Sequence, residues 1–105
     1  MSDQLLEEVK NYLDITWDLD AGERMKLSGI VSRGENYLRG KIGECDFEED
    51  TPEKELLMNY VMYVRAGRLS DFVTNYMREI IALQMNRWRI RKNAESKGKS
   101  VYHVQ

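Results

Sequence analysis

The sequence predicts an all-α fold: a small four-helix domain with a long C-terminal helix and a flexible basic tail. Two observations predict it. Apolar residues recur at helical spacing through almost the whole chain, and the single proline, Pro52, stands where a helix would begin. At 105 residues the chain is sized for one domain. We expect residues 1–92 to form the helical domain and residues 93–105, rich in Ser, Lys and Gly, to form the tail.

Two helices are predicted in the first 43 residues. The first lies within residues 2–15, where SDQLLEEVKNYLDI carries one apolar stripe and Ser2 or Asp3 is available as N-cap. The second spans residues 21–41, with Asp18 or Asp20 before it as N-cap and Gly43 at its end. Gly34 falls on its apolar face, where glycine costs about 1 kcal/mol relative to alanine. We interpret Gly34 as a point where another helix approaches closely.

Two further helices follow an acidic loop, GECDFEED, whose large apolar anchor is Phe47. Thr51 and Pro52 are the expected N-cap and first residue of the third helix, which ends at Gly67. The fourth is predicted from Ser70, as N-cap, to about Lys92. Its apolar face is wider than a small helical body can cover, so we expect part of it to meet another subunit or a partner.

The residues that could carry chemistry do not form a site. Asp46, Glu48 and Asp50 alternate like the first ligands of a calcium loop, but Thr51 replaces the required glycine and Leu57 the bidentate glutamate. Cys45 and His103 are the sole residues of their kinds, and His103 falls in the expected tail. There is no glycine-rich phosphate loop. We therefore expect no catalytic, metal or cofactor site and no enzymatic activity. The apolar runs are also too short for a membrane span.

The C-terminal segment NRWRIRKNAESKGKSVYHVQ differs in charge from the rest. Residues 86–105 carry net +5 and the remaining 85 residues net −7, within an overall charge of −2. Three interpretations stay open: a nucleic-acid hook, a docking arm for a protein, or a solubilising tail. The acidic body opposes phosphate binding, whereas Arg and Trp are enriched in protein interfaces. The candidate interface residues are Arg87, Trp88, Arg89, Arg91, Lys92, Val101, Tyr102 and Val104.

The order and spacing of several stretches resemble the small head–tail connector proteins of tailed bacteriophages, also called adaptor or head-completion proteins. The stretches are LLEEVKNYLDITW, the GENYLRG–IG end of the second helix, and LLMNYVMYVR followed by DF–NY–EI. Together the similar segments cover about residues 5–85. The AGRLSD segment and the basic tail do not match the family pattern.

The resemblance implies a structural subunit that joins the portal protein after DNA packaging. Copies would form a homo-oligomeric ring, matching a twelvefold portal, that extends the DNA channel and offers a surface to a stopper or tail-completion protein. DNA would pass through without specific binding. The protein would then be located at the head–tail junction of the virion, and in the host cytoplasm during assembly. The tail would become ordered on the portal.

Two functions of other classes remain as alternatives. A small DNA-binding regulator would use the fourth helix and the basic tail, and would give a salt-sensitive complex with duplex DNA. A host-directed interaction protein would copurify with a bacterial partner and form no ring.

Overall fold

The computed structural model describes the backbone of residues 3–103 and the side chains of residues 3–90 and 92. It contains four helices, and the part of the chain that it describes has no strand. The all-α, four-helix prediction is therefore confirmed. The helices are α1 (Asp3–Tyr12), α2 (Ala21–Ile42), α3 (Pro52–Arg65) and α4 (Leu69–His103).

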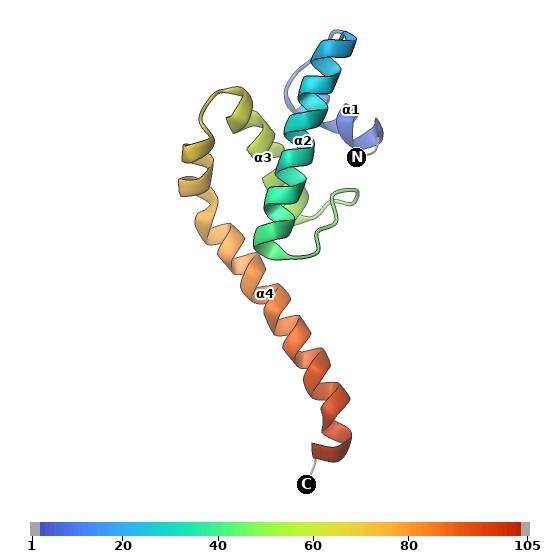
Figure 1. Cartoon of the computed structure of the whole chain (residues 1–105), viewed down its shortest axis with the longest axis vertical. Coiled ribbons are helices and arrows are strands. Elements are labelled where there is room, and N and C mark those ends of the chain that lie inside the picture. Colours follow the sequence, from blue (N-terminus) through green and yellow to red (C-terminus); the bar gives the residue numbers. More distant parts are fainter. Residues whose placement is uncertain (1–2, 104–105) are drawn as a thin grey trace.

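The four helices form a small body from which α4 projects (Figure 1). α2 packs against α3 and α4, α3 packs against α4, and α1 packs against α3. The molecule measures 64 × 28 × 18 Å. It is elongated because α4 passes the end of α2 and continues beyond it. The largest fully buried side chains belong to all four helices, and they are Leu5, Val9, Val31, Leu38, Leu57, Val61 and Phe72.

The starts of α2 and α3 follow local capping chemistry. The Asp20 carboxylate accepts a hydrogen bond from the Glu23 N–H at 2.8 Å, and the Glu23 carboxylate accepts one from the Asp20 N–H at 3.1 Å. The Thr51 hydroxyl accepts from the Lys54 N–H at 3.1 Å, and Pro52 is the first residue of α3. The predicted caps Asp20 and Thr51 are confirmed.

The prediction that Ser70 caps the fourth helix is wrong. The helix begins one residue earlier, so Ser70 lies inside its first turn. The Arg68 carbonyl accepts hydrogen bonds from the N–H groups of Asp71 at 3.0 Å and Phe72 at 3.3 Å. The Arg68 guanidinium also donates to the Asp71 carboxylate at 2.6 Å. Gly67, at φ +72°, reverses the chain sharply enough for the helix to start at once.

Gly34 is a close-approach position, as predicted. A Cβ added there would lie 2.7 Å from Leu57 Cδ1 and 2.7 Å from Tyr60 Cδ1, both in α3. Such distances are well inside van der Waals contact, so a larger side chain would push α2 and α3 apart. The glycine therefore sets how closely these two helices pack.

Asn59 of α3 joins three helices. Its side-chain oxygen accepts hydrogen bonds from the hydroxyl of Tyr12 in α1 at 3.2 Å and of Tyr76 in α4 at 3.1 Å. Its side-chain N–H donates to the Glu55 carbonyl at 2.9 Å. Asn59 is buried, and a buried amide needs such partners because desolvation without them is costly. The three bonds fix α1 and α4 against the same point of α3.

The long fourth helix runs further than the sequence predicted. Its 35 residues correspond to about 52 Å, and its backbone is helical to His103 rather than to about Lys92. The side chains beyond Lys92 lie outside the described residues, so the division into a domain of residues 1–92 and a flexible tail of residues 93–105 stays a prediction. No helix in the described chain is long and apolar enough to cross a membrane.

Candidate partner interface on α4

One side of α4 is held by an aromatic cluster. Phe72 is fully buried, and the ring of Tyr76 stacks on it with centroids 5.1 Å apart. Tyr60 and Tyr63 of α3 meet Phe72 edge to face at 5.5 and 5.9 Å. Further along the same side, Ile80 is buried. These contacts fix the rotation of α4, and hence the direction in which its remaining side chains point.

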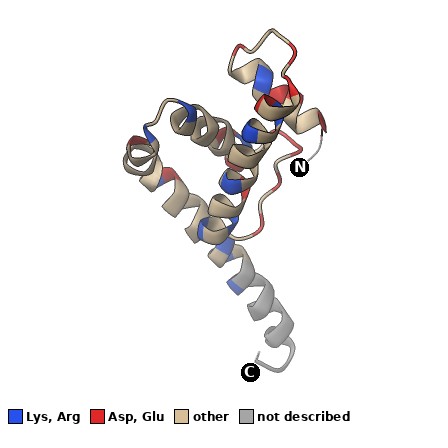
Figure 2. Cartoon of the chain, turned by 45° about the horizontal axis from the view of Figure 1, so that its top comes forward, with Lys and Arg blue, Asp and Glu red and all other residues tan. Residues whose placement is uncertain are grey.

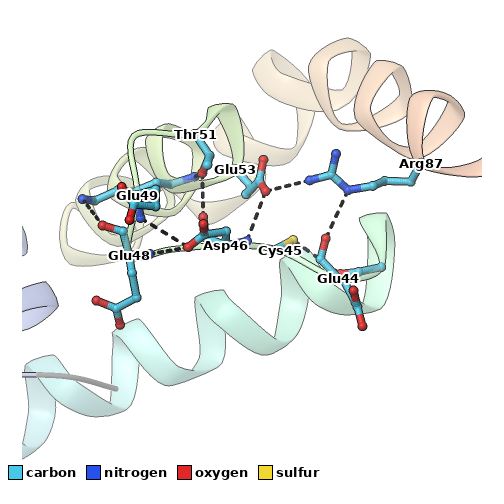
Figure 3. Close-up of polar contacts among 10 residues, drawn as sticks. Glu44, Cys45, Asp46, Glu48, Glu49, Thr51, Glu53 and Arg87 are labelled. Atoms are coloured by element: carbon cyan, nitrogen blue, oxygen red, sulfur yellow. Dashed lines mark hydrogen bonds and ion pairs between the residues drawn. The ribbon is translucent and has the colours of Figure 1, made fainter. Parts of the chain in front are cut away.

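Arg87 anchors α4 to α3 and to the loop that follows α2 (Figure 3). Its Nη2 donates to Glu53 Oε2 at 2.6 Å, and its Nε donates to the Glu44 carbonyl at 3.2 Å. One turn earlier, Gln84 donates to the Lys41 carbonyl at 2.8 Å, in the last turn of α2. One of the carbonyls that end α2, that of Lys41, therefore finds a donor on α4.

The Glu53 carboxylate is the buried partner of this anchor. Its side chain is 4% exposed, against 28% for Arg87, and it also accepts the Asp46 N–H at 3.1 Å. A carboxylate this buried needs a charged partner because desolvation otherwise penalises its ionised form. The ion pair links α3 to α4 and draws the acidic loop against both.

The acidic loop is organised by its own backbone. Asp46 Oδ1 accepts hydrogen bonds from the N–H groups of Glu48 at 2.9 Å and Glu49 at 3.2 Å, and the Thr51 hydroxyl donates to the Asp46 carbonyl at 2.6 Å (Figure 3). Phe47, which the sequence predicts as the apolar anchor of this loop, is buried. Within the part of the chain that is described, no group of His, Cys, Asp or Glu is placed to hold a metal ion.

Cys45 lies beside this loop, half-buried, and its thiol donates to the Gly43 carbonyl at 3.4 Å. Burial, followed by the carboxylate of Glu53, raises the pKa of the thiol. A raised pKa disfavours the thiolate, which is the reactive form. His103, the residue considered as its partner, has a side chain outside the described residues.

The opposite side of α4 carries an exposed apolar and basic surface, which we call the outer face. Its members recur at i, i+3, i+4 and i+7, so they share one side of the helix. Met85 and Trp88 are 53% and 54% exposed, and the Lys92 ammonium lies 5.5 Å from the centroid of the Trp88 ring. The outer face consists of Met85, Trp88, Arg89 and Lys92. Exposed Val73, Met77 and Ile81 continue the apolar stripe toward the start of α4.

The structure separates the residues that the sequence grouped as one interface. Arg87 is already bound within its own chain, whereas Trp88, Arg89 and Lys92 face solvent. The side chains of Arg91, Val101 and Tyr102 lie outside the described residues, as does Val104 altogether. Sequence reasoning missed Glu53, because an acid near the start of a helix is ordinarily a solvent-exposed dipole partner. The helical offset between Arg87 and Phe72, which share one side of α4, was the signal that could have assigned Arg87 to the body.

Comparison of the chain with known proteins matches no protein-family model, no curated protein and no solved structure.

Proposed function

We propose that the protein is a structural head–tail connector subunit of a tailed bacteriophage. In this role it assembles as a ring on the portal protein after DNA packaging, extends the DNA channel, and offers a surface to a stopper or tail-completion protein. It acts at the head–tail junction of the virion and is made in the host cytoplasm. No catalytic step is part of this role.

The observation that carries the proposal is the projection of α4 beyond the body (Figure 1). Among the described side chains, Gln84 and Arg87 make the last hydrogen bonds from α4 to the body. The helix then continues as a rod that bears Trp88, Arg89 and Lys92. A rod anchored at its root by a buried ion pair suits a subunit that reaches another component of an assembly. The sequence resemblance to connector proteins supports the same role.

The charge distribution supports the passage of DNA without binding. The 85 residues before the C-terminal segment carry net −7, and Figure 2 shows acidic residues along the loop between α2 and α3 and near the N-terminus. An acidic surface lining a channel repels phosphate, so DNA would find no counter-charge to hold it. The proposed ring has twelve copies, matching the twelvefold portal that the sequence resemblance implies.

Two truncations test the proposal. Ending the chain after Lys92 removes the segment expected to reach the portal but leaves the Arg87 anchor and the outer face. We expect unchanged helical content per residue in the body and loss of binding to portal-bearing capsids, measured by cosedimentation. A chain ending after Arg87 should lose binding as well. If both truncated proteins load onto capsids like the full chain, portal docking through this segment is wrong.

The exposed Trp88–Arg89–Lys92 surface favours one alternative, a small DNA-binding regulator, because base stacking and phosphate contacts need an aromatic ring beside cations. A gel shift with duplex DNA at low and raised salt separates the two functions. The regulator predicts a tight complex that salt weakens steeply. The connector predicts weak or no binding at physiological salt.

A further inference from the structure

A second surface of interest lies between α1 and the start of α3. It is an open groove of about 560 Å³. Met58 forms a buried apolar wall and Tyr12 a half-exposed one. The charged residues that line it are Glu8, Asp50, Lys54 and Glu55.

The groove has an excess of negative charge. The Lys54 ammonium, which is buried, is neutralised by the Glu8 carboxylate and also contacts the Glu48 carbonyl at 3.4 Å. The carboxylates of Asp50 and Glu55 are exposed, and Asp50 is close enough to the Lys54 ammonium to help raise its pKa, so the three carboxylates of the groove share one ammonium. Burial and then the Glu55 carboxylate raise the pKa of Tyr12, as expected where negative charge lies beside a phenol. The groove therefore fits a ligand that is apolar and basic.

The outer face of α4 has that chemistry. Trp88 offers a large ring that is exposed in the isolated chain, and Arg89 and Lys92 flank it with two cations. Burying an exposed indole is the largest apolar gain available on this helix. Facing Asp50 and Glu55, the two cations would exchange solvent contacts for opposite charges, which orients the approach and fixes the register.

The two surfaces cannot meet within one molecule. The outer face lies on the side of α4 turned away from the body, because Arg87, on the other side of the helix, holds α4 against Glu53 at the start of α3. Like surfaces of two copies would also repel, because the outer face is basic and the groove is acidic. Opposite charges are paired when the outer face of one copy lies on the groove of the next, as in a head-to-tail arrangement.

We propose that the outer face of α4 docks into the α1–α3 groove of a second copy of this chain, forming a head-to-tail interface. Such an interface leaves one unused groove and one unused outer face on every pair, so it propagates until a ring closes. The inference rests on the proposed function in one respect, because it equates the closed ring with the connector assembly. It assigns the Trp88–Lys92 turn to the neighbouring copy and leaves the segment after Lys92 for the portal.

Charge reversal tests the interface in the full-length chain. We expect the wild type to associate with rising concentration in sedimentation velocity, and Arg89→Glu/Lys92→Glu to weaken association about 100-fold or more. Arg24→Glu/Lys26→Glu, which changes the net charge equally on the exposed start of α2, is the matched control and should associate like the wild type. Circular dichroism checks that each variant keeps its helices. Equal association of both variants would overturn the proposal.

Mixing two defective proteins distinguishes head-to-tail from symmetric pairing. Asp50→Lys/Glu55→Lys should also be monomeric, because its groove now repels the outer face. Combined with Arg89→Glu/Lys92→Glu, it offers one native pair of surfaces and one charge-reversed pair, so the mixture should associate although each protein alone does not. Carrying all four substitutions in one chain should restore association. A mixture that stays monomeric contradicts this interface, as does an Asp50→Lys/Glu55→Lys protein that associates on its own like the wild type.

Trp88 fluorescence gives an independent readout. Trp17→Phe leaves Trp88 as the sole tryptophan, and its emission should shift to shorter wavelength as copies associate, because the indole leaves water. Emission that does not change on association would place Trp88 outside the interface. If duplex DNA shifts it instead, and Arg89→Glu/Lys92→Glu abolishes that shift without changing self-association, the surface serves nucleic acid and the inference is wrong.

The inference and the proposed function fail separately. A wild type that stays monomeric at every concentration overturns the interface, while capsid binding by that same protein would still support the connector role. A chain that ends after Lys92 should self-associate normally yet fail to bind capsids. Normal self-association of the full chain without any portal binding would instead leave the interface standing and remove the connector function.

Discussion

Arg87 and Arg89 lie two positions apart in the same helix, yet the structure gives them different roles. Two positions in a helix point to nearly opposite sides. Arg87 turns to the body and meets Glu53 and the Glu44 carbonyl, whereas Arg89 faces solvent on the side of Trp88. Arg87 therefore stabilises the fold, whereas Arg89 is available to bind a partner.

Replacing each arginine by methionine should show this difference. Arg87→Met leaves the buried Glu53 carboxylate without its charged partner, so we expect the free energy of unfolding to fall by about 1–3 kcal/mol. Arg89→Met should change it by less than about 0.5 kcal/mol. Adding Glu53→Gln should recover part of the loss in the first variant, which a denaturant-based double-mutant cycle measures. Equal effects of the two arginine changes would contradict the assignment.

Two glycines of α2 offer a second matched pair. Gly34→Ala places a methyl group 2.7 Å from two α3 side-chain atoms, and overpacking costs about 1–3 kcal/mol. Gly40 has no atom within 4 Å of an added Cβ, so Gly40→Ala should gain up to about 1 kcal/mol from helix propensity alone. We expect thermal unfolding to show Gly34→Ala destabilised and Gly40→Ala stabilised. A stabilising Gly34→Ala would mean that α2 and α3 can separate without cost.

At the scale of helices, Asn59 and the two tyrosines that donate to it hold α1, α3 and α4 together. Both hydroxyls must stay protonated to donate to the amide oxygen. Burial is the main cause that raises the pKa of Tyr12 and of Tyr76 above the ordinary value of 10.0. The junction of the three helices therefore depends on two neutral phenols.

Stability should fall in alkali for that reason. A phenol with a raised pKa in the folded state contributes stability that is complete below the unfolded value of 10.0 and is lost as pH rises through the folded value. The pKa of Lys54 is also raised, chiefly by its bond to Glu8, so the stability that this bond contributes to the fold is likewise lost as pH rises. Tyr12→Phe/Tyr76→Phe should be less stable at neutral pH but show a shallower decline above pH 10.0, measured by denaturant unfolding. An equally steep decline would show that the phenols do not carry it.

At the scale of the whole molecule, the projection of α4 sets the shape. The radius of gyration is 17.3 Å, whereas a compact chain of this length would have about 13 Å. Among the described side chains, Arg87 makes the last hydrogen-bonded contact of α4 with the body, and the helix continues beyond it. A helix that projects in this way suits a protein whose projecting part packs against other molecules of an assembly.

Small-angle scattering checks this shape in dilute solution. We expect a radius of gyration near 17.3 Å for the full chain and a value approaching that of a compact body for a chain that ends after Arg87. The truncated chain should keep its unfolding transition, because every core residue among the described side chains precedes the cut. A full chain that scatters as a compact particle would show α4 folded back onto the body.

The sequence by itself determined the helices and most of their ends. Asp20, Thr51, Pro52 and Gly43 act on the backbone within a few residues of themselves, and local chemistry of this kind is readable from order alone. The close approach of another helix at Gly34 could be predicted too, because a glycine on the apolar stripe of a helix leaves room for a neighbouring helix.

Only the tertiary structure decided which charges are internal and which are free. Glu53 and Arg87 are 34 positions apart, and Lys54 and Glu8 are 46 apart, so nothing local marks them as partners. Their pairing depends on how α1, α3 and α4 cross, which is set by the whole core. The same packing leaves Trp88 and Arg89 outside and forms the acidic groove between α1 and α3. Charge counts along the chain therefore indicate that a basic end exists, while long-range packing decides which of its residues can reach another molecule.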